Sequence, residues 1–152
     1  HTPNGDLTTR IGGVIDRMDS KDGILRIVDY KTGGSADKSQ SIDSLFMRDK
    51  NRSGYIFQTF LYASIMSRPS QQRIAPALLY IHRAAADDYS PIIRIKEDKE
   101  VEEVLDFSIY EGKFREKLQE LLEEIFHPDI PFTQTDVEDK CAYCDFKAMC
   151  RK

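Results

Sequence analysis

The chain has 152 residues, a formal net charge of −4 and 40% hydrophobic residues. This length and composition allow one domain with its own hydrophobic core. They argue against a membrane-spanning chain, because no apolar run approaches the roughly 20 residues that a spanning helix needs. The acidic balance also argues against a protein that binds nucleic acid through bulk positive charge alone. The abrupt start at His1 predicts a fragment of a longer protein.

The first half of the chain predicts two strands joined by a tight turn. Residues 6–19 alternate apolar side chains with the period of a strand, and residues 24–31 form a second apolar run. The polar run 19–23 ends in glycine, which is typical of a hairpin turn. Residues 33–53 predict a long loop, with one helical turn at the apolar patch 45–47.

The second half predicts two helices and two further strands. Residues 54–67 predict a mostly apolar helix that ends at Arg68-Pro69. The nearly continuous apolar run 75–83 predicts a strand buried on both faces, and residues 92–95 a short fourth strand. Apolar residues recur at helical spacing from 99 to 126 and predict one long helix with a charged outer face.

Charged side chains lie at the ends of the first two apolar runs. Asp29 and Lys31 are two residues apart on the second predicted strand, so their side chains point to the same face of the sheet. Asp16 ends the run before it. Two carboxylates beside a fixed positive charge can hold a divalent metal and cleave a phosphodiester. On one strand alone, an ordinary solvated strand end is an equal alternative.

Several motifs follow one another in a fixed order along the chain. They are Gly13-Val14-Ile15-Asp16-Arg17, then Ile27-Val28-Asp29-Tyr30-Lys31-Thr32-Gly33, then Gln58 with Tyr62, then the three cysteines near the C-terminus. This order resembles the PD-(D/E)XK nuclease superfamily, in its RecB-like branch. The resemblance is closest to the C-terminal nuclease domain of AddB-type helicase–nuclease subunits. It covers nearly the whole chain, over about residues 10–150.

The resemblance implies a restriction-endonuclease-like α/β core, with a mixed central sheet flanked by helices, in a single nuclease domain over residues 1–152. It implies that Asp16 and Asp29 hold Mg²⁺ or Mn²⁺, with the backbone carbonyl of Tyr30 completing the shell. Lys31 would orient or deprotonate the attacking water and steady the charge on the phosphate.

Gln58 and Tyr62 match the helix motif of the branch and share one face of the predicted helix. The resemblance implies that they lie beside the site and contact DNA or the catalytic lysine, which adds them to the catalytic set. The alternative is that they pack and hydrogen-bond the helix to the sheet.

One part of the pattern of the branch lies outside the sequence. Its members carry a histidine or glutamate on a helix upstream of the first acidic strand, and the fifteen residues before Asp16 are too few for that helix. His1 is not expected to replace it. We therefore expect an incomplete metal site and a fragment that is inactive alone.

The three cysteines Cys141, Cys144 and Cys150 lie in the tail 136–152. An odd cluster at one end is not a disulfide framework and predicts an intracellular, cytoplasmic protein. By resemblance, the spacing matches the iron–sulfur staple of AddB-type and some CRISPR-associated nucleases, whose fourth cysteine lies far upstream. A [4Fe–4S] cluster is thus expected in the full-length protein only. A zinc site with His127 and simple reduced cysteines are the alternatives.

The function that the resemblance implies is Mg²⁺-dependent cleavage of DNA, exonucleolytic and acting at broken ends, within a repair and recombination machine. Its partners would be DNA and a helicase–nuclease subunit, with no membrane. A stand-alone CRISPR-associated nuclease is one alternative, since it shares these motifs. A non-catalytic DNA-binding or scaffolding module is another, although a scaffold has no need for Asp16, Asp29 and Lys31 together.

Overall fold

The computed structural model describes residues 5, 8–34, 39–48, 52–68, 72–97, 99–136 and 138–151. Its elements are, in chain order, β1 (Arg17–Lys21), β2 (Ile24–Lys31), η1 (Asp43–Phe46), α1 (Gly54–Met66), β3 (Arg73–Tyr80), η2 (Ile81–Arg83), β4 (Arg94–Glu97), β5 (Glu100–Glu103), α2 (Ser108–Ile125) and α3 (Glu138–Cys141). Among these described helices, none is both long enough and apolar enough to cross a membrane.

A three-stranded mixed sheet in the order β1–β2–β3 positions the rest of the molecule. β1 and β2 are antiparallel and turn at Asp22-Gly23, where both residues have positive φ, as a two-residue hairpin turn requires. β2 and β3 run parallel through the α1 crossover, with Lys31 opposite Tyr80. The mixed α/β fold expected from the sequence is confirmed.

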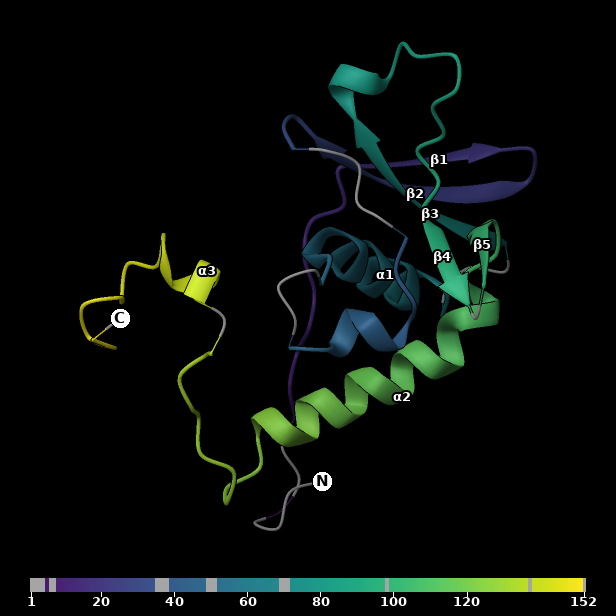
Figure 1. Cartoon of the computed structure of the whole chain (residues 1–152). Helices are drawn as coiled ribbons and strands as arrows, with labels where there is room; N and C mark the ends of the chain where they lie inside the picture. Colours follow the sequence, from purple (N-terminus) through teal and green to yellow (C-terminus); the bar gives the residue numbers. More distant parts are fainter. Residues whose placement is uncertain are drawn as a thin grey trace.

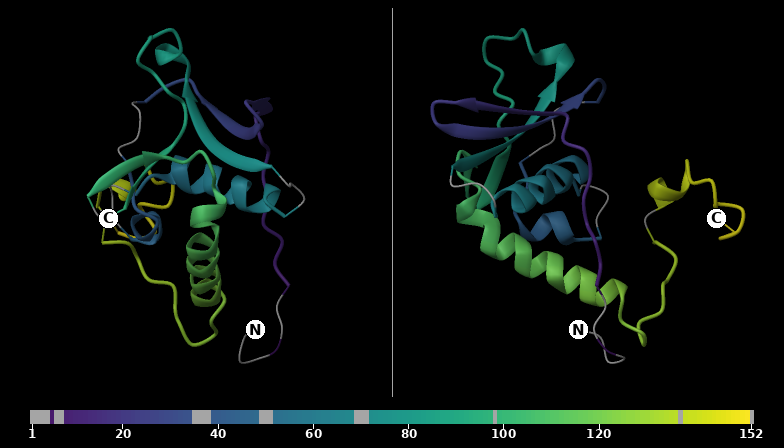
Figure 2. Two further views of the ribbon diagram at one scale, coloured as in Figure 1. Left: turned by 90° about the vertical axis from the view of Figure 1, so that its right-hand side faces the viewer. Right: turned by 180° about the vertical axis from the view of Figure 1, so that it is seen from behind.

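Both described long helices lie on one side of this sheet (Figure 1). Figure 2 shows the same from two further directions, with α1 next to the sheet and α2 beyond it. Ser53 caps α1 by accepting a hydrogen bond from the Ile56 N–H at 3.0 Å. Between sheet and helices, the ring of Phe60 contacts Phe107 and Phe114, with centroids 5.2 and 5.8 Å away. These aromatic rings fill the core against the face of β2 that carries Ile27.

The outer edge of β3 is hydrogen-bonded by segments that are not regular strands. The bonds run from Phe107 N to Ile74 O, from Ile93 N to Pro76 O, from Leu78 N to Pro91 O, from the Tyr89 hydroxyl to Leu78 O and from Tyr80 N to the Tyr89 hydroxyl. The backbone N–H and C=O groups of the even-numbered residues of β3 therefore point to this edge of the sheet. Pro76 is one of them, so its missing N–H removes no bond to β2.

The strand predicted over residues 6–19 is wrong for most of its length. β1 begins only at Arg17 and includes residues assigned to the turn, while residues 8–16 belong to no strand. Residues 6 and 7 lie outside the described residues. The path before β1 follows α1 instead of a neighbouring strand, because Gly13 packs on Tyr62 and Val14 is 80% exposed.

The long helix predicted from residue 99 is also wrong at its start. Residues 100–103 form β5, which pairs with β4 as a hairpin, and α2 begins at Ser108. Val104 is buried and donates its N–H to Ile93 O at 2.9 Å. The mixture of valine and glutamate over residues 100–104 fits a strand as well as a helix. Pairing with β4 decides in favour of the strand.

The remaining predicted elements shift by a few residues. The third strand ends at Tyr80, and residues 81–83 form the short helix η2. The fourth strand begins at Arg94, with Ile92 bridged to Ala77 before it. The helix α1 and the helical turn η1 lie where the sequence predicts them.

Candidate active site

Asp29 and Lys31 lie at the carboxyl end of β2, on the face that α1 covers. Asp29 is only 5% exposed, and its Oδ2 forms an ion pair with the Lys31 ammonium. Ile27, two residues earlier on the same face, belongs to the core. A carboxylate buried next to apolar side chains is costly unless it is paired, and Lys31 supplies that pairing. The alternative of a solvated strand end does not fit this burial.

Asp16 approaches the same strand end from the residue just before β1. Its Oδ2 accepts a hydrogen bond from the Tyr30 N–H at 2.8 Å. This N–H belongs to the peptide that joins Asp29 to Tyr30, so the Asp16 carboxylate lies beside the end of β2 that carries Asp29. Asp16 is exposed, and the site therefore opens to solvent on its side.

The first turn of α1 brings Tyr55 onto Lys31. The Lys31 Nζ lies 3.9 Å from the centroid of the Tyr55 ring, within the range of a cation–π contact. Tyr55 was not among the residues assigned to the site from the sequence. The available signal was its position three residues before Gln58, which puts the two on neighbouring parts of one helix face.

Gln58 and Tyr62 hydrogen-bond to each other on α1. The Gln58 Nε2 donates to the Tyr62 hydroxyl at 2.9 Å, and Tyr62 is 6% exposed. Among the described residues, the hydrogen bonds of these two side chains do not include Lys31. This hydrogen bond lies within α1, so a contact of the pair with DNA and a hydrogen bond from the pair to the sheet both stay predictions.

Tyr62 also explains the glycine in the segment before Asp16. A Cβ built on Gly13 would lie 2.5 Å from the Tyr62 hydroxyl oxygen and 2.7 Å from Cε1, closer than such atoms approach. The backbone at Gly13 can thus pass directly over the ring only because it carries no side chain. This contact places the Gly13–Arg17 motif against the Gln58–Tyr62 motif and sets the path that delivers Asp16.

The donor set fits a hard divalent cation such as Mg²⁺ or Mn²⁺. Asp16 and Asp29 offer carboxylate oxygens and Tyr30 a backbone carbonyl, which are the ligands such ions prefer. Asp29 Oδ2 is buried with no hydrogen bond, and its partner is the Lys31 cation. The described part of the chain contains no group of three His, Cys, Asp or Glu that could hold a metal. Two carboxylates still suffice for Mg²⁺, which usually keeps several waters.

The three cysteines are free and lie in the C-terminal segment, which extends away from the sheet and helices (Figure 1). Cys144 is exposed, and Cys141 and Cys150 are half-buried. Neither they nor His127 belong to a metal-binding group within the described residues. The His127 Nδ1 instead accepts the Asp129 N–H at 3.2 Å. An assembled zinc or iron–sulfur site is therefore not part of the described structure.

Comparison with known families agrees with this geometry. The model of the PD-(D/E)XK nuclease superfamily matches residues 3–151. The chain belongs to this superfamily, a class of nucleases. No curated protein and no solved structure matches the chain. The superfamily expected from the motifs is thereby confirmed, and so is the assignment to a nuclease fold.

Proposed function

We propose that the chain is the catalytic domain of a metal-dependent DNA nuclease of the RecB-like branch. One observation carries the proposal: Asp16 is bonded to the backbone of β2 between Asp29 and Lys31, and the latter two form a buried ion pair. Two acids and one cation then converge at a site open to solvent. A purely structural module would not benefit from burying Asp29 at this strand end.

Each side chain has a separate task in phosphodiester hydrolysis. Asp16, Asp29 and the Tyr30 carbonyl would hold Mg²⁺ or Mn²⁺, which supplies Lewis acidity and lowers the pKa of bound water. Lys31 would orient the water and stabilise the negative charge that develops on the phosphate oxygens. The oxygen of water forms the new bond to phosphorus as the bond from phosphorus to the leaving oxygen breaks. The attacking water gives up its proton to solvent, and the leaving oxygen takes a proton from solvent and departs as an alcohol. The Tyr55 ring and the Asp29 carboxylate would keep Lys31 in place.

The biological setting follows from the motif resemblance. We infer exonucleolytic action at DNA ends as part of a repair and recombination helicase–nuclease, with residues 1–152 as one nuclease domain and 136–152 as its cysteine tail. The contact between Gly13 and Tyr62 supports the branch assignment, because it joins two of the motifs physically. A further acidic or histidine ligand and a fourth cysteine would come from upstream sequence, which would complete the metal site and a [4Fe–4S] cluster.

The test compares cleavage of linear DNA with and without Mn²⁺ or Mg²⁺, by the chain and by a version extended upstream. We expect metal-dependent degradation by the extended version and not by the chain alone. In the extended version, Lys31→Ala and Asp29→Ala should each reduce the rate of degradation by about 10²–10³-fold. Lys21→Ala is the matched control, because Lys21 is an exposed lysine at the turn end of the same hairpin.

Two results would contradict the proposal. Equal cleavage by Lys31→Ala, Asp29→Ala and the unchanged protein would mean that the activity comes from another site or from a contaminant. DNA binding without any cleavage by the extended version would instead assign the chain to the non-catalytic alternative. Covalently closed circular DNA tests the preference for ends, since an exonuclease should leave it intact.

A further inference from the structure

A cavity of about 260 Å³ lies beside the carboxyl end of β3. Leu78 and Tyr80 form part of its wall, and they are the register partners of Asp29 and Lys31. Paired residues on parallel strands point to the same face of a sheet. The cavity is therefore on the same face as the acidic site and one strand away from it, at a strand spacing of about 5 Å.

The opposite wall is the segment after η2, which is firmly attached to β3. The Tyr89 hydroxyl donates to Leu78 O at 2.6 Å and accepts from Tyr80 N at 2.8 Å. Pro91 O accepts the Leu78 N–H at 2.8 Å. These bonds fix the wall to the strand next to Asp29, so the cavity is formed before any ligand binds.

The cavity combines an apolar floor with a polar rim. Its buried apolar lining is Ile56, Leu78 and Ile93, and its more exposed lining includes Val101, Arg83, Arg94, Ser39, Ser90 and one acid, Asp88. Such a surface suits a ligand with a flat apolar part and a negative group. A nucleotide has both, a base and a phosphate.

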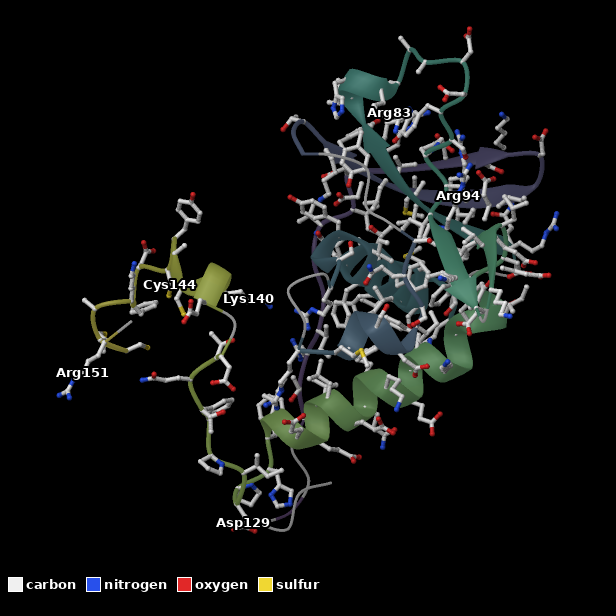
Figure 3. All side chains as sticks on the ribbon, in the orientation of Figure 1. Arg83, Arg94, Asp129, Lys140, Cys144 and Arg151 are labelled. Atoms are coloured by element: carbon white, nitrogen blue, oxygen red, sulfur yellow. The ribbon has the colours of Figure 1, made fainter. Side chains whose placement is uncertain are left out.

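Arg83 and Arg94 supply the positive charge of the cavity lining. The Arg83 guanidinium lies 5.3 Å from the centroid of the Tyr89 ring, and this contact orients it. Arg94 is 57% exposed and reaches Glu103 at 3.5 Å, the long limit of a hydrogen bond. Figure 3 labels Arg83, the last residue of η2, and Arg94, the first residue of β4, on the same part of the molecule.

We propose that this cavity binds one unpaired nucleotide of the DNA strand next to the phosphodiester at Asp29 and Lys31. The base occupies the apolar floor and its phosphate contacts Arg83 and Arg94. The volume is below the roughly 300–1,000 Å³ of sites for larger ligands, which suits a single base. This inference rests on the proposed function, since it assigns the strand that the acidic site would cleave.

The test measures binding of a fluorescent single-stranded oligonucleotide by anisotropy in EDTA, where metal-dependent cleavage cannot interfere. Arg83→Ala and Arg94→Ala should each weaken binding about tenfold, as expected for loss of one charge-assisted contact. Each should also reduce the slope of log K against log salt by about one. Arg73→Ala is the matched control, because it removes the same charge from the opposite end of β3 and should change binding less than twofold.

A second pair of variants tests the cavity without changing charge. Val101→Trp enlarges an exposed side chain that lines the cavity and should obstruct entry of the single strand, whereas Ile109→Trp adds the same ring at an exposed position on α2 and should not. Absence of binding by the unchanged chain, or equal binding by Val101→Trp, Arg83→Ala and the unchanged chain, overturns the inference. A failed cleavage test with arginine-dependent binding would instead reject only the hydrolytic function.

Discussion

The β1–β2 hairpin carries ion pairs at both of its ends, and the two ends differ in how the carboxylate is bonded. Near the turn, Asp19 accepts hydrogen bonds on both oxygens from Arg26, the second at 2.9 Å, and also pairs with Arg17 at 2.6 Å. At the other end, Asp29 pairs through one oxygen with the ammonium of Lys31. The first set is a closed network of one acid and two arginines. The second is a single pair beside a solvent-facing acid.

One end of the hairpin therefore holds a structural ion pair and the other a pair that leaves part of its carboxylate accessible. A planar guanidinium engages both carboxylate oxygens and holds them, whereas an ammonium is a point charge on a flexible stem. Both carboxylate oxygens of Asp19 are thereby engaged within the protein. Lys31 neutralises the charge of Asp29 through one carboxylate oxygen only. A metal cation can therefore still bind the carboxylate of Asp29, and a phosphate can still contact the ammonium of Lys31. Four substitutions test this contrast and the contacts around it.

The largest effect is expected for Asp29→Asn in the presence of metal. Mn²⁺ at about 100 times its dissociation constant should stabilise the unchanged protein by about 2.7 kcal/mol and raise Tm by about 5–10 °C. Asp29→Asn should lose this increase, while Asp19→Asn keeps it. Thermal unfolding with and without Mn²⁺ measures both. An equal increase in all three proteins would place the metal elsewhere.

Gly13→Ala should destabilise the protein by about 1–3 kcal/mol, because the new methyl group collides with the Tyr62 ring. Gly12→Ala is the control, since a Cβ there meets nothing within 4 Å. Urea unfolding of the two variants gives the difference directly. Equal stability of the two variants would contradict the close packing of Gly13 on the Tyr62 ring.

Tyr55→Leu should lower kcat about two- to fivefold, which corresponds to a cation–π contact of about 0.5–1 kcal/mol at a partly exposed site. KM for DNA and the Tm should change little, because the ring acts on Lys31 and is itself 45% exposed. Tyr55→Phe retains the ring and should restore kcat. A loss that Tyr55→Phe shares would point to the hydroxyl instead.

The smallest effect is expected for Asp19→Asn, and it depends on pH. The hydrogen bond from Arg26 holds the pKa of Asp19 below its usual value. The carboxylate therefore stabilises the fold above the pKa of the unfolded chain, near 3.9, and this contribution is lost as pH falls through the lower folded pKa. Asp19→Asn should reduce the unfolding free energy by about 0.5–1 kcal/mol at pH 7 and by progressively less below pH 4. A constant difference across this range would exclude the ionised pair as its cause.

Local patterns in the sequence were sufficient for the elements that dominate the core. The apolar runs of β2 and α1 predict both elements, and the spacing of Asp29 and Lys31 predicts their common face. The start of α2 was missed because the residues of β5 fit two periods, and only pairing with β4 resolves them.

The parts of the site that depend on contacts between distant segments could not be predicted in this way. Tyr55 meets Lys31 only after α1 has packed on the sheet. The cavity forms only when the segment around Tyr89 returns to β3, eleven residues after Leu78. Neither of these two contacts produces a recognisable pattern in the sequence around the residues that form it.

The Tyr89 hydroxyl has a consequence for how this molecule meets its neighbours. An edge strand normally presents free peptide groups on which a strand of another molecule can pair and start aggregation. Along the carboxyl half of β3, one phenol oxygen both donates to and accepts from the strand, in the place of two peptide groups. The sheet is thus closed to growth at this edge by a side chain. Colloidal stability and the shape of the proposed nucleotide site depend here on the same two hydrogen bonds.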